Sequence, residues 1–130
     1  MLFRLLGAFG RRIGLAFQIL DDVLDVSGPA ERTGKHRGTD LLDGTVTLPL
    51  IIACERDAAL GRLDLRAVTT AAQAGDLCDR IAATGALDEA RSVALGLVAE
   101  AKGELDAEVL GPARAQALGL VADSVVERYR

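Results

Sequence analysis

The stretch FQILDDVLDVSG, Phe17 to Gly28, places three carboxylates in an otherwise apolar run. They belong to Asp21, Asp22 and Asp25, and the residues between and before them are isoleucine, leucine and valine. On a helix, Asp21 and Asp25 lie one turn apart on the same face, and Asp22 lies about 100° around the axis from Asp21. The three carboxylates can therefore converge on one spot.

Such a cluster of carboxylates is either a solvated helix end or a cation site. Like charges one turn apart cost a few tenths of a kcal/mol on an exposed helix, but a pair about 4 Å apart costs roughly 4 kcal/mol at an effective dielectric near 20. In a partly enclosed site the cluster therefore needs a cation. Mg²⁺ suits it, because this ion binds one or two carboxylates and takes other ligands from substrate phosphates. A solvated helix end is the simpler alternative, although acidic residues near a helix C-terminus oppose the helix dipole.

Hydrophobic periodicity around this stretch predicts one long helix over residues 1–26. Apolar residues recur there at steps of three and four, namely Leu2, Leu5, Leu6, Phe9, Ile13, Phe17 and Leu20. The pattern stops at Ser27, and residues 27–46 mix glycine, proline, serine, threonine and charged residues without any period. A loop of that length is uncommon unless it is functional.

Residues 47–130 are expected to form further helices. Thr47 is a suitable N-cap for the first of them, and Pro112 suits the first turn of the last one. Two short helices are predicted between these, ending at Gly75 and Gly85, because glycine commonly follows the last helical residue.

Composition favours a single all-α domain over residues 1–130. The chain is half hydrophobic, which is enough to build the core of one domain, and it has no alternating strand pattern. Its net charge of -4 and its lack of tryptophan argue against nucleic acid as a partner. No apolar run approaches the roughly 18 residues of a membrane span. Cys54 and Cys78 form neither a CxxC pair nor a zinc pattern, so a reducing cytoplasm is the expected compartment.

Four linked segments resemble the second aspartate-rich region of the trans-prenyltransferases, the polyprenyl synthetase family. In order they are GLAFQILDDVLDVSG (14–28), GK (34–35), GTDL (38–41) and TLPLI (47–51). The closing LVADSVVERYR also looks like the C-terminus of that family. The resemblance implies a helical bundle that is the C-terminal portion of the isoprenoid synthase fold. It also implies Mg²⁺-dependent condensation of an allylic prenyl diphosphate with isopentenyl diphosphate.

The resemblance also implies roles for particular residues. Asp21 and Asp22, with Asp25 less directly, would hold Mg²⁺ on the allylic diphosphate, and Asp21, Asp22 and Lys35 would form the catalytic set. Lys35 would bind the oxygens of that diphosphate as a point charge. A solvated loop lysine is the alternative for Lys35.

Two further residues receive substrate-binding roles from the same resemblance. Gln18, one turn before the aspartates, would stabilise the metal and carbocation region, and a purely structural role is its alternative. Phe17 would line the channel for the allylic chain, with ordinary core packing as its alternative.

Two departures from the family pattern bear on activity. Many members have a lysine where this chain has Thr45, and the chain has no second DDxxD segment. We therefore expect this chain to lack the half that binds isopentenyl diphosphate, an oligomer or partner helices to supply it, and the lone chain to be inactive. The alternatives are a non-catalytic helical partner subunit, a truncated remnant of such an enzyme, and an unrelated helical domain with an acidic helix end.

Overall fold

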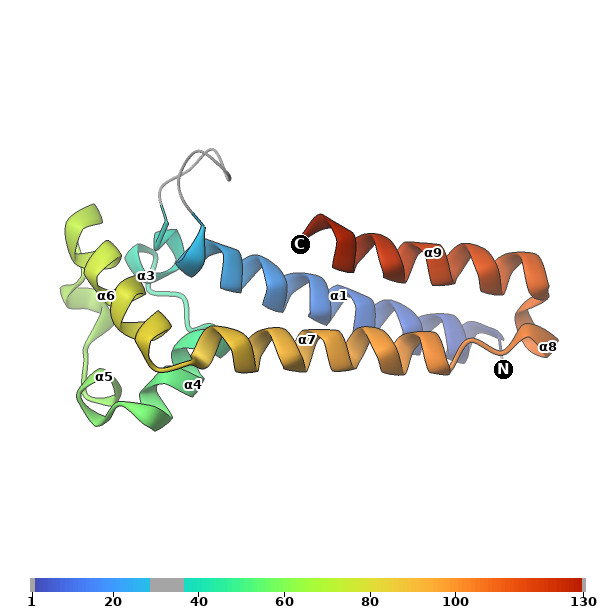
Figure 1. Cartoon of the computed structure of the whole chain (residues 1–130), viewed down its shortest axis with the longest axis horizontal. Helices are drawn as coiled ribbons and strands as arrows, with labels where there is room; N and C mark the ends of the chain where they lie inside the picture. The colour runs from blue at the N-terminus through green and yellow to red at the C-terminus, as the bar shows by residue number, and fades with distance from the viewer. Residues whose placement is uncertain (1, 29–36, 130) are drawn as a thin grey trace. The chain divides into compact units, whose positions relative to one another are not determined.

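The computed structural model describes residues 2–28 and 37–129, and every regular element in these ranges is a helix. The all-α class predicted from the sequence is therefore confirmed. The elements, shown in Figure 1, are α1 (Leu2–Ser27), α3 (Thr39–Leu42), α4 (Leu48–Arg56), α5 (Ala58–Gly61), the 3₁₀ helix η1 (Leu65–Ala67), α6 (Ala71–Ala83), α7 (Ala86–Gly103), α8 (Ala107–Leu110) and α9 (Pro112–Arg128).

The chain divides into two compact units. Residues 1–18 and 92–130 form one, which we call the bundle unit, and residues 19–91 form the other, the motif unit. Helices α1 and α7 contribute residues to both. Each unit is described below by itself.

The bundle unit consists of the first part of α1, the second part of α7, α8 and α9. Its interior contains small side chains, and the fully buried alanines are Ala16, Ala94, Ala101 and Ala122. Exposed ion pairs join these elements, since Arg12 of α1 bonds Glu104, directly after α7, at 2.8 Å, and Lys102 of α7 bonds Asp123 of α9 at 2.6 Å. Pro112 occupies the first turn of α9, as predicted from the sequence.

In the motif unit, α4 packs on α5 and α6, and α3 packs on α6 and η1. Helix α6 begins with a capping box, in which the Thr70 hydroxyl accepts from the Gln73 amide and the Gln73 side chain accepts from the Thr70 amide. It ends before Gly85, whose φ of +80° is the conformation expected there. The short helix predicted to end at Gly75 is wrong, because the capping box starts one helix that runs through Gly75.

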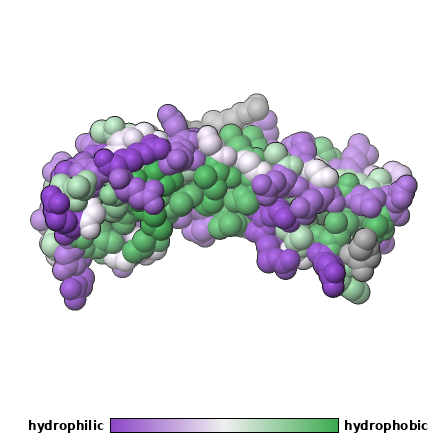
Figure 2. Space-filling view, turned by 90° about the horizontal axis from the view of Figure 1, so that it is seen from below, coloured by the Kyte–Doolittle hydropathy of each residue, from purple (hydrophilic) through white to green (hydrophobic). Residues whose placement is uncertain are grey.

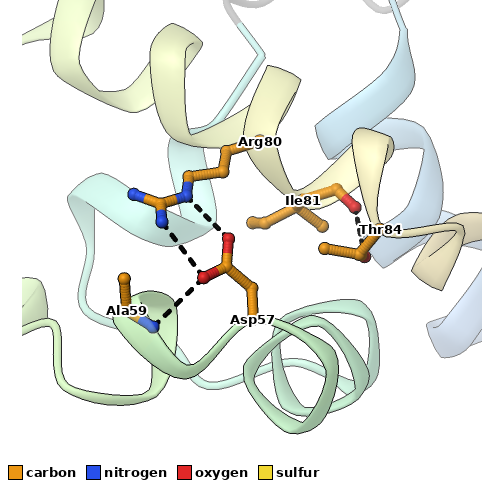
Figure 3. Close-up of polar contacts among 5 residues, drawn as sticks. All are labelled: Asp57, Ala59, Arg80, Ile81 and Thr84. Atoms are coloured by element: carbon orange, nitrogen blue, oxygen red, sulfur yellow. Dashed lines mark hydrogen bonds and ion pairs between the residues drawn. The ribbon is translucent and has the colours of Figure 1, made fainter.

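An ion pair ties α6 to the start of α5 (Figure 3). Arg80 of α6 donates to both carboxylate oxygens of Asp57, at 2.7 and 3.0 Å. Asp57 is also the N-cap of α5, and its carboxylate accepts from the Ala59 amide at 3.1 Å. The same figure shows the Thr84 hydroxyl donating to the Ile81 carbonyl at the end of α6.

The predicted loop over residues 27–46 contains α3, which the sequence pattern did not indicate. Helix α4 begins after Thr47 as predicted, although the Thr47 side chain makes no capping hydrogen bond. Within the described ranges, α1 ends at Ser27, one residue beyond the predicted boundary.

Large apolar side chains reach the surface in both units, and Figure 2 shows green patches interrupting the purple surface. Those of the motif unit include Val46, Ile51 and Leu63, which line a pocket of about 500 Å³ beside α4 and α5. None of the described helices is both long enough and apolar enough to cross a bilayer.

Candidate functional site

The three aspartates of the acidic segment differ in exposure. Asp21 is exposed, Asp22 is half-buried, and Asp25 is only 4 % exposed. Val23 and Val26 on the same turns belong to the core of the motif unit. The helix end therefore offers two carboxylates to solvent and turns the third inward.

Asp25 binds the start of α3. Its Oδ2 accepts a hydrogen bond from the Asp40 amide at 3.1 Å, and its main-chain carbonyl accepts from the Gly38 amide at 2.9 Å. Gly38 is the N-cap of α3 and has no side chain that could accept from the first turn. The Asp25 carboxylate therefore supplies, from another helix, the acceptor that an N-cap side chain normally provides.

Helix α6 holds the same turn from a second direction. Gly38 has a φ of +82°, and a Cβ built on it would lie 2.9 Å from Ala74 Cβ and 3.2 Å from Cys78 Sγ. Nη2 of Arg37 donates to Asp79 Oδ1 at 2.7 Å and to the Gly75 carbonyl at 3.1 Å. Only glycine fits at position 38, because a side chain would be strained and would collide with α6.

The two cysteines are free thiols without a reactive environment. Burial raises the pKa of Cys78 to about 11, and it also raises the pKa of Cys54. Both thiols are therefore protonated at neutral pH, and a thiol is a much weaker nucleophile than a thiolate.

The end of α1 carries two carboxylates, on Asp21 and Asp22, of the kind that Mg²⁺ binds. Across residues 2–28 and 37–129, no three His, Cys, Asp or Glu side chains are grouped so that they could hold a metal ion. Asp25 directs one oxygen to the Asp40 amide, whereas Asp21 and Asp22 are accessible. Mg²⁺ needs only one or two carboxylates when phosphates and water complete its shell.

Of the other predicted site residues, two lie on α1 one turn before the aspartates, and one lies outside the described residues. Lys35 falls outside the described residues. Gln18 is exposed on α1 and belongs to the bundle unit, as does Phe17. The Phe17 ring packs edge-on against Tyr129, with centroids 5.8 Å apart, and the Arg128 guanidinium lies 5.0 Å from its centre. Phe17 thus packs against the end of the chain, and its role in an allylic channel stays a prediction.

The contacts that the sequence analysis missed are those of Arg37 with α6. The pattern Thr70-Ala-Ala-Gln73 is a capping-box signal that locates the start of α6. It does not pair Asp79 with Arg37, because these residues are 42 positions apart and each also reads as an ordinary surface charge.

Comparison with known proteins gives a consistent set of relatives. A short chain isoprenyl diphosphate synthase of Methanothermobacter thermautotrophicus is 39 % identical over 126 residues, covering 92 % of this chain and 38 % of the relative. For heptaprenyl diphosphate synthase component 2 of Bacillus subtilis the identity is 33 % over 121 residues, covering 92 % and 34 %. A Synechocystis prenyl transferase is 48 % identical over 69 residues, covering 53 % and 20 %.

This chain thus spans between a fifth and two-fifths of the length of these three relatives. The family model described as polyprenyl synthetase matches residues 2–81, which include the whole acidic segment, α3 and most of α6. The chain belongs to the polyprenyl synthetase family.

Proposed function

We propose that this chain is part of a chain-elongating prenyltransferase and supplies the wall that binds the allylic diphosphate through Mg²⁺. The observation that carries the proposal is the acidic end of α1, which presents Asp21 and Asp22 within the segment matched by the family. The relatives are named as isoprenyl and heptaprenyl diphosphate synthases, and the same substrates are proposed here. These are an allylic prenyl diphosphate and isopentenyl diphosphate.

In this proposal Asp21 and Asp22 hold Mg²⁺, and Asp25 acts mainly by holding α3. When bound, Mg²⁺ would neutralise the negative charge on the departing diphosphate. Lys35 would add an ammonium contact to the diphosphate oxygens. The role of Gln18 near the metal stays a prediction from the family, and so do the allylic channel for Phe17 and the cytoplasmic location.

Partner helices from a second polypeptide, or from a longer form of this protein, complete the proposed enzyme. The short span relative to the relatives supports this, and so does the printed name of the Bacillus relative, which calls it a component. Exposed apolar side chains in both units provide surfaces for such association. A non-catalytic partner subunit is the second candidate. Incubation with Mg²⁺, both substrates and the N-terminal half of a family member separates the two, since only the enzyme part gains turnover.

The experiment that tests the site is titration calorimetry with inorganic diphosphate, with and without Mg²⁺. Binding is expected only when both are present, because carboxylates and anion need the cation between them. Asp21→Ala should abolish this binding. Asp43→Ala removes another exposed carboxylate, on the C-cap of α3, and should leave it nearly unchanged. A folded wild-type chain that gives no Mg²⁺-dependent heat contradicts the proposed site.

A further inference from the structure

We infer that the Arg37–Asp79 ion pair is a positioning element of the diphosphate site, because it holds the start of α3 against α6 while Asp25 holds it against α1. The inference rests on the proposed function, since it concerns how the position of the end of α1, which bears Asp21 and Asp22, is maintained. Arg37 and Asp79 are positioning residues in this account, and neither is assigned a contact with substrate.

Two hydrogen bonds join the turn at Gly38 to α1. Two amides of this turn, those of Gly38 and Asp40, donate to the backbone carbonyl and the carboxylate of the single residue Asp25. Asp25 follows Asp21 by one turn of the same helix. The main chain of residues 38–40 is therefore fixed directly to the helical segment that carries the accessible carboxylates.

The side chain of Arg37 joins the same turn to α6. One nitrogen of Arg37 bonds both a side-chain acceptor on Asp79 and a main-chain acceptor on Gly75. Glycine at position 75 leaves room for this approach, since a Cβ there would lie 3.8 Å from that nitrogen. The guanidinium is thus held by two acceptors one helical turn apart, and it is partly buried, with 34 % of the side chain exposed.

Together, the hydrogen bonds to Asp25 and the Arg37–Asp79 ion pair hold residues 37–40 between α1 and α6. Loss of the Arg37–Asp79 pair removes one of the side-chain contacts that hold the turn, and the two amide bonds to Asp25 then open more often. Because these bonds also orient the end of α1, the geometry around Asp21 and Asp22 becomes less well defined. An anion that needs both carboxylates and a metal is sensitive to such a loss of order.

Charge reversal separates positioning from a direct electrostatic effect on the bound anion. Arg37→Glu makes the chain more negative and Asp79→Arg makes it more positive, so a direct field effect weakens anion binding in the first variant and tightens it in the second. Positioning predicts weaker binding in both. The double variant Arg37→Glu/Asp79→Arg restores the pair with its charges exchanged and should recover binding.

The neighbouring ion pair on α6 provides the matched control. Arg80 follows Asp79 directly, but it joins α6 to Asp57, the N-cap of α5, instead of to α3 (Figure 3). Arg80→Glu and Asp57→Arg carry the same charge changes as Arg37→Glu and Asp79→Arg. They also remove an exposed ion pair of the same helix.

The measurement is the affinity for inorganic diphosphate in the presence of Mg²⁺. Both reversals of the Arg37–Asp79 pair should weaken it roughly two- to fivefold, the range that an exposed ion pair can supply. The exchanged pair should return it to within about twofold of wild type, and the control variants should leave it there too. Effects of opposite sign in Arg37→Glu and Asp79→Arg, or no effect in either, overturn the inference. If a reversal prevents folding, Arg37→Gln and Asp79→Asn take its place.

Hydrogen exchange gives a second readout that needs no ligand. The amides of Gly38 and Asp40 should exchange faster in Arg37→Glu and Asp79→Arg than in wild type and in Arg80→Glu. If wild type binds no diphosphate, the proposed function fails. The exchange rates of the Gly38 and Asp40 amides still decide whether the Arg37–Asp79 pair positions the turn. Unchanged exchange at both amides overturns the inference whatever the chain binds.

Discussion

Helix α1 is held in two different ways in the two units of this chain. In the motif unit, its residue Asp25 is buried and bonds the backbone of the α3 turn. In the bundle unit, its residue Arg12 forms an exposed ion pair with Glu104, the residue directly after α7. The first contact fixes particular backbone amides, whereas the second joins two side chains at the surface.

The packing around these contacts also differs between the two units. Gly38 of the motif unit lies so close to α6 that no side chain fits, and its backbone conformation is one that L residues rarely adopt. The bundle unit packs alanines between regular helices, and Gly96 on α7 has open space where a Cβ would be. The comparison indicates that the motif unit depends on individual backbone positions, while the bundle unit depends on small side chains along regular helices.

The largest expected effect tests this contrast with one kind of substitution in both units. Gly38→Ala should destabilise the chain by about 2–4 kcal/mol, because it combines positive-φ strain with a collision against Ala74 and Cys78. Gly96→Ala should stabilise it by about 0.5–1 kcal/mol, because alanine favours a helix interior and fits there. Urea denaturation of both variants gives the two free energies. Similar losses in both would mean that the two units do not differ in this way.

A smaller effect is expected from the two acidic side chains that hold α1. Asp25→Ala should cost about 1–3 kcal/mol, because it leaves the part-buried Asp40 amide without its acceptor. Asp25→Asn keeps an acceptor oxygen and should cost less. Glu104→Ala should cost at most about 1 kcal/mol, since it removes one exposed ion pair. Equal urea midpoints for Asp25→Ala and Glu104→Ala would remove the structural role assigned to Asp25.

Much of the helical fold could be predicted from local signals. The break after Ser27, the helix end before Gly85 and the proline at the start of α9 were all readable, because caps and breakers act within a few residues. The same local reasoning gave a wrong helix end at Gly75, because glycine commonly follows the last residue of a helix but here lies inside α6. There the capping box at Thr70 and the contact with Arg37 outweigh a local preference.

The site could be predicted less completely. Helical spacing placed Asp21 and Asp25 one turn apart, but it did not predict that Asp21 is exposed and Asp25 buried. Their difference in exposure arises from α3, a four-residue helix whose acceptor comes from another element. Such a helix has almost no periodicity of its own, so the sequence around Gly38 and Asp40 predicted only a loop.

The smallest expected effect is a pH dependence within the motif unit, at the half-buried carboxylate of Asp57, which contrasts with fully buried Asp25. The hydrogen bonds from Arg80 lower the pKa of Asp57 below its ordinary 3.8, helped by the charge of Arg80 and the amides of Leu60 and Ala59. A carboxylate with a lowered folded-state pKa stabilises the fold above its unfolded-state pKa and loses that contribution as the pH falls through the folded-state value. The stability supplied by the Asp57 charge is thus complete above about pH 5 and declines below about pH 4.

Comparison of wild type with Asp57→Asn isolates this contribution, because asparagine keeps an acceptor for the α5 cap and carries no charge. The urea midpoint of wild type should exceed that of Asp57→Asn at pH 6, and the gap should narrow as the pH falls below about 4 and Asp57 becomes protonated. In an Arg80→Gln background the gap should be small at every pH, since the main cause of the lowered pKa is gone. A gap that keeps its size down to pH 2 would mean that asparagine disturbs the α5 cap itself. A gap that survives Arg80→Gln would mean that the amides of α5, and not the ion pair, hold the Asp57 charge.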